Sequence, residues 1–177
     1  MEIYKEDMDY EVFKVLLKKA LLRYGGKLHA YCLMKNHYHL LLETEHEEVW
    51  KIMKIISQQY AMYYNRKNNY KGHLFENRYK SCMVDTDEYF LQTSRYIHLN
   101  PVKAHIVNDP QEYRWSSYST IIGISDDKLV TITKTLAHFK NSVIRYRTFV
   151  DDIGHKYVID EESIRREIGE DELWLPW

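Results

Sequence analysis

The sequence predicts an α+β fold, in which an antiparallel sheet carries helices on one face and a helical extension follows. Three observations lead to this expectation. Two long segments repeat apolar residues at helical spacing. Two strand-like runs joined by a tight connection lie between them. A third helical segment, rich in aromatic residues, comes later. Helices and a hairpin in this order are typical of a sheet covered by helices.

The first helical segment is marked by apolar residues at helical spacing: Val12, Phe13, Leu16, Leu17, Ala20 and Leu21. Gly25-Gly26 is expected to end it, because glycine readily adopts the left-handed conformation that closes helices. Residues 27–34 and 37–43 are then predicted to form two strands, joined by a tight connection at Lys35-Asn36.

A second helix is marked by Val49, Ile52, Met53, Ile56, Tyr60 and Tyr63, and it is expected to run to about Asn65. A loop follows, and residues 78–84 are predicted to form a further strand. Asp85, with Glu88 three positions later, predicts the start of a third helix. Pro101 is expected to end that helix, because proline disfavours the helical conformation before it.

The length of 177 residues suits one domain with a small appendage. The boundary is placed between a core domain, 1–120, and a helical C-terminal extension with an acidic tail, 121–177. Within the extension, residues 133–138, 141–150 and 161–169 are predicted to be helical. The two tryptophans that close the chain favour a docked tail over a partner-binding motif, because exposed paired aromatics are a liability.

Composition and charge limit the possible functions. No apolar run approaches the ~20 residues that a membrane span needs, and no signal peptide is visible at the charged N-terminus, so no membrane contact and a cytoplasmic location are expected. Cys32 and Cys82 are interpreted as reduced core thiols. The net charge of −1 argues against nucleic acid, but residues 151–177 hold nine acidic and three basic residues, which leaves +5 elsewhere.

Five cations gather in a short stretch of this basic part, with Glu76 as the one acidic residue among them: Arg66, Lys67, Lys71, Arg78 and Lys80. Such a cluster predicts contacts with a phosphate backbone. A solvated loop is the alternative interpretation, because runs of charge commonly face water.

The most informative stretch places His37 and His39 one residue apart in an apolar, strand-like run. Residues i and i+2 of a strand point to the same side, so the two imidazoles are spaced to hold one divalent metal. Two partly buried histidines without a ligand are the alternative, because a short motif alone carries a real risk of a false match.

Tyr96 and Asn100 lie four residues apart and therefore share one face of the third helix. The amide oxygen of Asn100 is a candidate third metal ligand, and the Tyr96 phenol is a candidate nucleophile. Core packing for Tyr96 and helix capping for Asn100 remain the alternatives. His98 points away from Tyr96 on a helix and is interpreted as a packing or surface residue.

Three segments together carry a family resemblance: N-H-Y-H-L-L-L at 36–42, G-H-L-F-E-N-R-Y-K-S at 72–81 and R-Y-I-H-L-N-P-V-K-A at 95–104. From about Ile3 to about Tyr118 the chain resembles the single-tyrosine HUH transposases, most of all the branch of REP-associated tyrosine transposases. The resemblance implies a ferredoxin-like, RRM-like sheet and makes residues 1–120 an HUH transposase-like catalytic domain.

The resemblance also implies the chemistry. His37, His39 and Asn100 carry over as ligands of Mg²⁺ or Mn²⁺, and Tyr96 carries over as the nucleophile. The expected activity is nicking and strand transfer on single-stranded or hairpin DNA through a 5′-phosphotyrosine intermediate. Some relatives share active sites between two subunits, so a homodimer is compatible with this expectation.

Two departures from the family pattern leave other functions open. Tyr38 stands where the family usually has a bulky apolar residue, and the family's first strand, with its Arg-Gly-Asn-like turn, is not seen before Ile3. A mis-set start, a truncated gene or a strand from elsewhere would account for this. The alternative function is therefore a catalytically impaired relic that only binds hairpin DNA. A zinc protein using Cys32, His37 and His39 is a third, weaker alternative.

Overall fold

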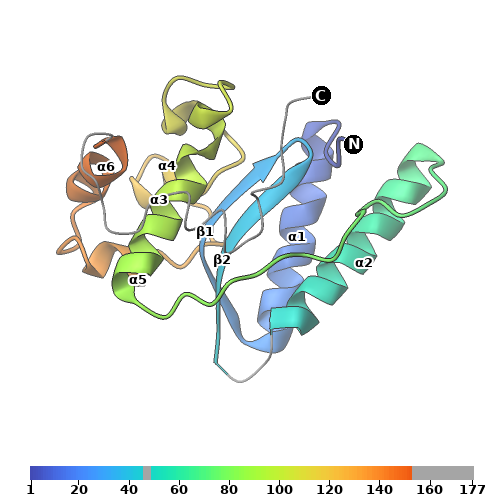
Figure 1. Cartoon of the computed structure of the whole chain (residues 1–177), viewed down its shortest axis with the longest axis horizontal. Helices are drawn as coiled ribbons and strands as arrows, with labels where there is room; N and C mark the ends of the chain where they lie inside the picture. The colour runs from blue at the N-terminus through green and yellow to red at the C-terminus, as the bar shows by residue number, and fades with distance from the viewer. Residues whose placement is uncertain (46–48, 153–177) are drawn as a thin grey trace.

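The computed structural model describes residues 1–45 and 49–152. A two-stranded antiparallel hairpin lies between two groups of helices, α1 and α2 on one side and α3 on the other (Figure 1). The elements are α1 Asp7–Tyr24, β1 Gly26–Met34, β2 His37–Thr44, α2 Val49–Asn68, α3 Asp87–Lys103, the 3₁₀ helix η1 Pro110–Glu112, α4 Tyr118–Ile121, α5 Thr133–Ala137 and α6 Val143–Asp151. The described helices include none that is long and apolar enough to cross a bilayer.

Helix α1 ends where its sequence predicts, and a cap that the sequence analysis did not include begins it. Glu6 and Asp9 form a capping box, in which each side chain accepts a hydrogen bond from the other's backbone N–H. The helix ends at Tyr24 because Gly25 takes a left-handed conformation, with φ of 66°, that a residue with a Cβ rarely adopts.

The hairpin positions the two histidines. Its register pairs Met34 with His37 and Cys32 with His39. Neighbouring residues on a strand point to opposite faces, so Tyr38 faces Phe13 of α1 at a ring-centroid distance of 4.8 Å. His39 faces Tyr96 of α3 at 5.6 Å.

The α+β class with antiparallel pairing is thus confirmed. The layering differs from the expectation of helices on one face, because the Tyr38 side of the hairpin is covered by α1 and the His39 side by α3. Both faces of β2 carry aromatic or aliphatic side chains, and each face is partly covered by a helix; Leu41 is the residue of β2 that is buried.

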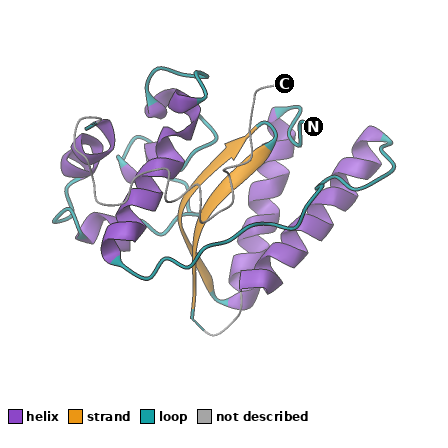
Figure 2. Cartoon of the chain, in the orientation of Figure 1, coloured by secondary structure: helices purple, strands orange, loops and turns teal. Residues whose placement is uncertain are grey.

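Three local predictions in this region were wrong: a strand at 78–84, the start of the third helix at Asp85 and its end at Pro101. Residues 78–84 form no strand and belong to the loop that leads from α2 to α3 (Figure 2). Tyr79, Cys82 and Val84 instead pack as side chains against the core. Helix α3 starts after Thr86, whose hydroxyl oxygen accepts the N–H of Tyr89 at 3.1 Å. It also continues through Pro101, because proline already has a helical φ and removes a single N–H donor.

The C-terminal segment packs on the far side of α3. A second apolar cluster there joins Leu99 of α3 to Tyr118, Ile121, Ile122, Leu136, Tyr146 and Val150. Helices α5 and α6 agree with the helical predictions for 133–138 and 141–150. The predicted helix at 161–169 and the two terminal tryptophans lie outside the described residues.

Candidate active site

The two histidines of β2 point at one another on the α3 face of the hairpin. Their Nε2 atoms are 3.1 Å apart, and their rings are nearly perpendicular. The Asn36 side-chain oxygen lies 2.7 Å from His37 Nδ1 and, as an acceptor, favours a proton on that nitrogen. His37 then presents the lone pair of Nε2 toward His39. Two nitrogens bound to one metal at ~2.1 Å lie ~3.0–3.4 Å apart, so the observed spacing fits a shared ion.

Asn100 supplies an oxygen at the same place. Its amide nitrogen donates to the backbone carbonyl of Tyr96 at 3.1 Å, one turn earlier in α3. Its side chain also shares a hydrogen bond with His39. Because the amide nitrogen is engaged with the backbone, Oδ1 is the atom presented to the histidines. Two imidazole nitrogens and one amide oxygen make a donor set that suits Mn²⁺, and Mg²⁺ less well.

His39 is uncharged at neutral pH. Burial of its ring, which disfavours the charged form, lowers its pKa to about 4, and the Asn100 hydrogen bond opposes this only in part. A neutral imidazole keeps the lone pair that a metal ligand needs.

Tyr96 sits directly against this group. Its side chain is buried, and its ring meets the His39 ring edge-on. Lys103, two turns further along α3, places its Nζ 5.1 Å from the centre of the Tyr96 ring. Lys103 is a site residue that was not predicted from the sequence. Its position seven residues after Tyr96, on the same helix face, was the signal that could have found it.

The opposite face of α3 anchors the helix that carries these residues. Both ring nitrogens of His98 are hydrogen-bonded at 2.7 Å, one to the Tyr146 hydroxyl and one to the Ser117 hydroxyl. Arg95 donates to the carbonyl oxygens of Val150 at 3.2 Å and Asp152 at 2.5 Å. His98 is therefore a packing residue. Its burial lowers its pKa to about 3.

The five predicted DNA-contact residues do not converge on the histidines. Arg66 and Lys67 lie in the last turn of α2, on the other side of the hairpin, and Lys71, Arg78 and Lys80 are exposed in the loop that follows. Lys67 forms ion pairs with Glu6, at 2.7 Å, and with the buried carboxylate of Asp9. These partners raise the pKa of Lys67, against the opposing effect of burial, and they neutralise its ammonium charge.

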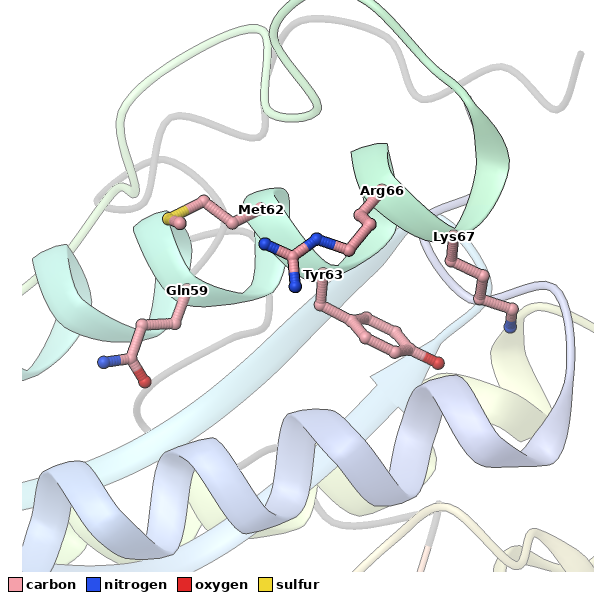
Figure 3. A pocket seen from close by; sticks show the side chains of 5 residues that line it. All are labelled: Gln59, Met62, Tyr63, Arg66 and Lys67. Carbon is pink, nitrogen blue, oxygen red and sulfur yellow. The ribbon is translucent and has the colours of Figure 1, made fainter.

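A shallow groove of about 400 Å³ runs along α2 beside Arg66 and Lys67 (Figure 3). It is lined by Gln59, Met62, Tyr63, Arg66 and Lys67. The Tyr63 hydroxyl donates to Asp9 at 2.9 Å, so this ring is held in place by the same carboxylate that binds Lys67. Arg66, the other cation of the groove, is also exposed.

The zinc interpretation finds no support in the described part of the chain. Cys32 is paired in register with His39, but its thiol contacts the Met34 sulfur at 3.6 Å, and burial raises its pKa. Residues 1–45 and 49–152 hold no cluster of three or more His, Cys, Asp and Glu that could bind a metal. A thiol kept protonated by burial is a poor zinc ligand.

Comparison with known proteins gives one match. A family model described as "Transposase IS200 like" matches residues 2–100. The matched segment runs through both strands of the hairpin and most of α3, and it includes His37, His39, Tyr96 and Asn100. No curated protein and no solved structure matches the chain.

Proposed function

The chain belongs to the family of IS200-like transposases, and from this premise we propose that it nicks and rejoins single-stranded or hairpin DNA through Tyr96. One observation carries the proposal. A buried tyrosine, an oriented amide oxygen and two facing imidazoles meet between α3 and β2. Phosphoryl transfer needs little covalent apparatus beyond a positioned nucleophile and charge stabilisation, and this group of residues offers both.

His37, His39 and Asn100 would hold the metal, with Mn²⁺ or Mg²⁺ as the expected ion. When bound there, the ion would polarise a scissile phosphate as a Lewis acid. The neutral state of His39 and the orientation of the Asn100 amide prepare these ligands before the ion arrives. Asn36 supports His37 in the same way, through its contact with Nδ1.

Tyr96 acts as the nucleophile in this proposal. The phenol gives up its proton to solvent, its oxygen bonds to phosphorus, and the bond from phosphorus to the 3′ oxygen breaks. That oxygen takes up a proton and leaves as a 3′ hydroxyl, while the 5′ phosphate stays on Tyr96. Attack by another 3′ hydroxyl reverses the step, and one phosphodiester replaces another without ATP.

Lys103 assists the same step. Its ammonium lies beside the Tyr96 ring, at 5.1 Å from the centroid. Positive charge near a phenol favours the phenolate form, and a fixed cation also stabilises negative charge that develops on the phosphoryl group. The role of Lys103 is therefore electrostatic.

The exposed cations Lys71, Arg78, Lys80 and Arg66 are proposed to contact the DNA backbone in the cytoplasm. Three of them follow the loop from α2 toward the start of α3 (Figure 1). This loop offers a path for a strand that ends at Tyr96. Lys67 is assigned a structural part, because Asp9 and Glu6 already hold it.

A second candidate function is binding of hairpin DNA without cleavage. It is favoured by the sheet, because β2 pairs only with β1 within the described residues. The strand that carries both histidines is thus held by one neighbour, which gives the metal ligands less support than a wider sheet would provide.

The deciding experiment is a covalent adduct assay. The protein is incubated with hairpin-containing single-stranded DNA and Mn²⁺, and a shifted band is sought under denaturing conditions. Tyr96→Phe should abolish the band and leave DNA binding intact, because one hydroxyl is removed. The matched control is Tyr89→Phe, which removes the hydroxyl of another buried α3 tyrosine and should keep the adduct.

The possible outcomes separate the two candidates. An adduct that persists in Tyr96→Phe would assign the nucleophile to another tyrosine. A wild-type protein that binds the hairpin but forms no adduct would favour binding without cleavage.

A further inference from the structure

One hydroxyl group of the C-terminal segment contacts α3 both before and after Tyr96. The Tyr146 hydroxyl oxygen of α6 lies 2.8 Å from Ser94 Oγ and 2.7 Å from His98 Nδ1. Ser94 and His98 stand two positions before and two positions after Tyr96, one helical turn apart on one face of α3. Tyr146, Ser94 and His98 are all fully buried. Tyr146 lies beyond residues 2–100, the part of the chain that the family model matches.

The hydrogen bonds continue from α3 to the hairpin. Ser117 Oγ lies 2.7 Å from His98 Nε2, accepts the N–H of Tyr31 in β1 at 2.8 Å and donates to the Tyr31 carbonyl oxygen at 3.3 Å. Burial lowers the pKa of His98 to about 3, so the imidazole carries one proton at neutral pH. With that proton on Nε2, the ring donates to Ser117 and accepts from Tyr146. The Tyr146 oxygen then accepts from Ser94, so every hydrogen of this group has an acceptor.

We propose that Tyr146 is a positioning residue for the Tyr96 nucleophile, so that the C-terminal segment is a working part of the catalytic unit. This inference rests on the proposed function, because it concerns the same nucleophile. Residues two positions apart in an α-helix are about 200° apart around its axis. Tyr96 therefore points away from Tyr146 and toward His39, with 5.6 Å between the centres of the Tyr96 and His39 rings. Contacts of one hydroxyl with two residues one turn apart resist both rotation of α3 and sliding along its axis.

Small rotations of α3 matter at the nucleophile. At ~6 Å from the axis of a helix, a rotation of about 10° moves an atom by about 1 Å. A misplacement of about 1 Å can cost about 100-fold in rate, because the reacting atoms leave the geometry of attack. Phosphoryl transfer depends mainly on positioning and charge stabilisation. The orientation that Tyr146 gives to α3 is therefore expected to affect the rate at Tyr96.

Tyr146 is better suited to orient α3 than the other contacts of α6. Its rigid ring is packed edge-on against Phe139 at a centroid distance of 5.3 Å, which holds the hydroxyl in place. Arg95 donates to the carbonyl oxygens of Val150 and Asp152, but its long side chain has the rotamer freedom to follow a rotating helix. The apolar contacts of α6 are non-directional. The Tyr146 hydroxyl thus supplies the directional contact.

The first test measures the rate of adduct formation at saturating hairpin-containing single-stranded DNA and Mn²⁺. Tyr146→Phe keeps the ring and removes only the hydroxyl, and it should lower this rate about 10–100-fold. The DNA concentration that gives half the maximal rate should stay unchanged, because no cation of the loop is altered. Ser94→Ala, a milder variant that leaves the His98 contact in place, should lower the rate by a smaller factor. The matched control is Val150→Ala, which thins the apolar cluster around α6 and keeps both hydroxyl contacts, so it should lower stability but not the rate.

The second test needs neither DNA nor metal. The side-chain amide signal of Asn100 in the NMR spectrum is assigned by its loss in Asn100→Leu. This amide donates to the Tyr96 carbonyl oxygen and shares a hydrogen bond with His39, so a rotation of α3 should shift its signal. The shift is expected in Tyr146→Phe and not in Val150→Ala.

The outcomes separate this inference from the proposed function. A wild-type rate in Tyr146→Phe, or an equal loss of rate in Val150→Ala, would reduce Tyr146 to a contributor to stability. A wild type that forms no adduct would overturn the proposed function, and the Asn100 signal then decides alone. A shift confined to Tyr146→Phe would retain the positioning role, and an unchanged signal would overturn it.

Discussion

Asn100 and His39 share a hydrogen bond across the gap between α3 and β2. The same amide donates through its nitrogen to the Tyr96 carbonyl oxygen. One side chain thus sets the distance between the strand that carries the histidines and the helix that carries the tyrosine. The local order of the site depends on this amide even before a metal or DNA arrives.

We first predict that metal binding depends on this amide. Asn100→Leu keeps the bulk and removes both polar atoms, and it should weaken Mn²⁺ binding about 10–100-fold in calorimetric titrations. Asn100→Asp should bind Mn²⁺ at least as tightly as the wild type, because a carboxylate is also an oxygen ligand. His37→Ala/His39→Ala should abolish the site, and EDTA should stop adduct formation. Unchanged Mn²⁺ affinity in Asn100→Leu would remove Asn100 from the ligand set.

The second prediction concerns Lys103. Lys103→Met keeps a long side chain without charge, and it should slow adduct formation about 100-fold, the usual effect of losing one electrostatic stabiliser. Lys103→Arg should retain most of the rate. In Lys103→Met the rate should rise toward higher pH, because the phenol loses the nearby cation that favours its phenolate. A pH profile identical to that of the wild type would show that Lys103 only packs against Tyr96.

The third prediction separates Lys67 from the exposed cations. Lys67→Met leaves the buried Asp9 carboxylate without its cation, and it should lower the free energy of unfolding by about 1–3 kcal/mol in urea. Lys80→Gln should leave stability unchanged and reduce the log–log salt slope of single-strand binding by about 0.7. The salt slope in Lys67→Met should stay at its wild-type value. A reduced slope there would return Lys67 to the DNA surface.

The fourth prediction is a pH dependence at the end of the hairpin far from the site. Hydrogen bonds from Lys134 and then Lys27 lower the pKa of Glu43 to about 2. The stability from this lowered pKa is complete above the ordinary value near 4.5 and is lost as the pH falls toward 2. Because Glu43 is partly exposed, Glu43→Gln should cost about 1–2 kcal/mol at pH 7 and almost nothing near pH 2. Urea unfolding at both pH values measures the difference.

The fifth prediction concerns the anchor behind α3. His98→Phe keeps an aromatic ring but leaves the buried hydroxyls of Tyr146 and Ser117 without their imidazole partner. The free energy of unfolding should fall by about 2–4 kcal/mol. The control is His73→Phe at an exposed position, which should stay within about 0.5 kcal/mol of the wild type. A stable His98→Phe would show that the position of α6 does not depend on the His98 hydrogen bonds.

Much of this arrangement could be predicted from the sequence because local rules decide it. The alternation around Tyr38 places His37 and His39 on one side of β2, and helical spacing places Asn100 beside Tyr96. Both relations involve residues fewer than five positions apart. Gly25 ends α1 for an equally local reason.

The parts that could not be predicted depend on distant residues. Lys67 is held by Asp9, which is 58 positions away, and no local pattern indicates that pair. Residues 78–84 have aromatic and apolar side chains suited to a strand, but a strand also needs a neighbour with free backbone groups. In the loop, the Tyr79 side chain is instead partly buried by packing against the core.

The contacts of Arg95 and His98 divide the R-Y-I-H-L-N-P segment into two sets of positions. Tyr96 and Asn100 face the histidines. Arg95 is hydrogen-bonded to α6, and His98 is hydrogen-bonded to α6 and to Ser117. Because the two sets contact different parts of the molecule, we expect them to be constrained differently among related chains. Among related chains, positions 96 and 100 should vary with the chemistry, whereas positions 95 and 98 should co-vary with the sequence that follows α3. A relative with a different C-terminal extension is therefore expected to change Arg95 and His98 together and still keep its tyrosine.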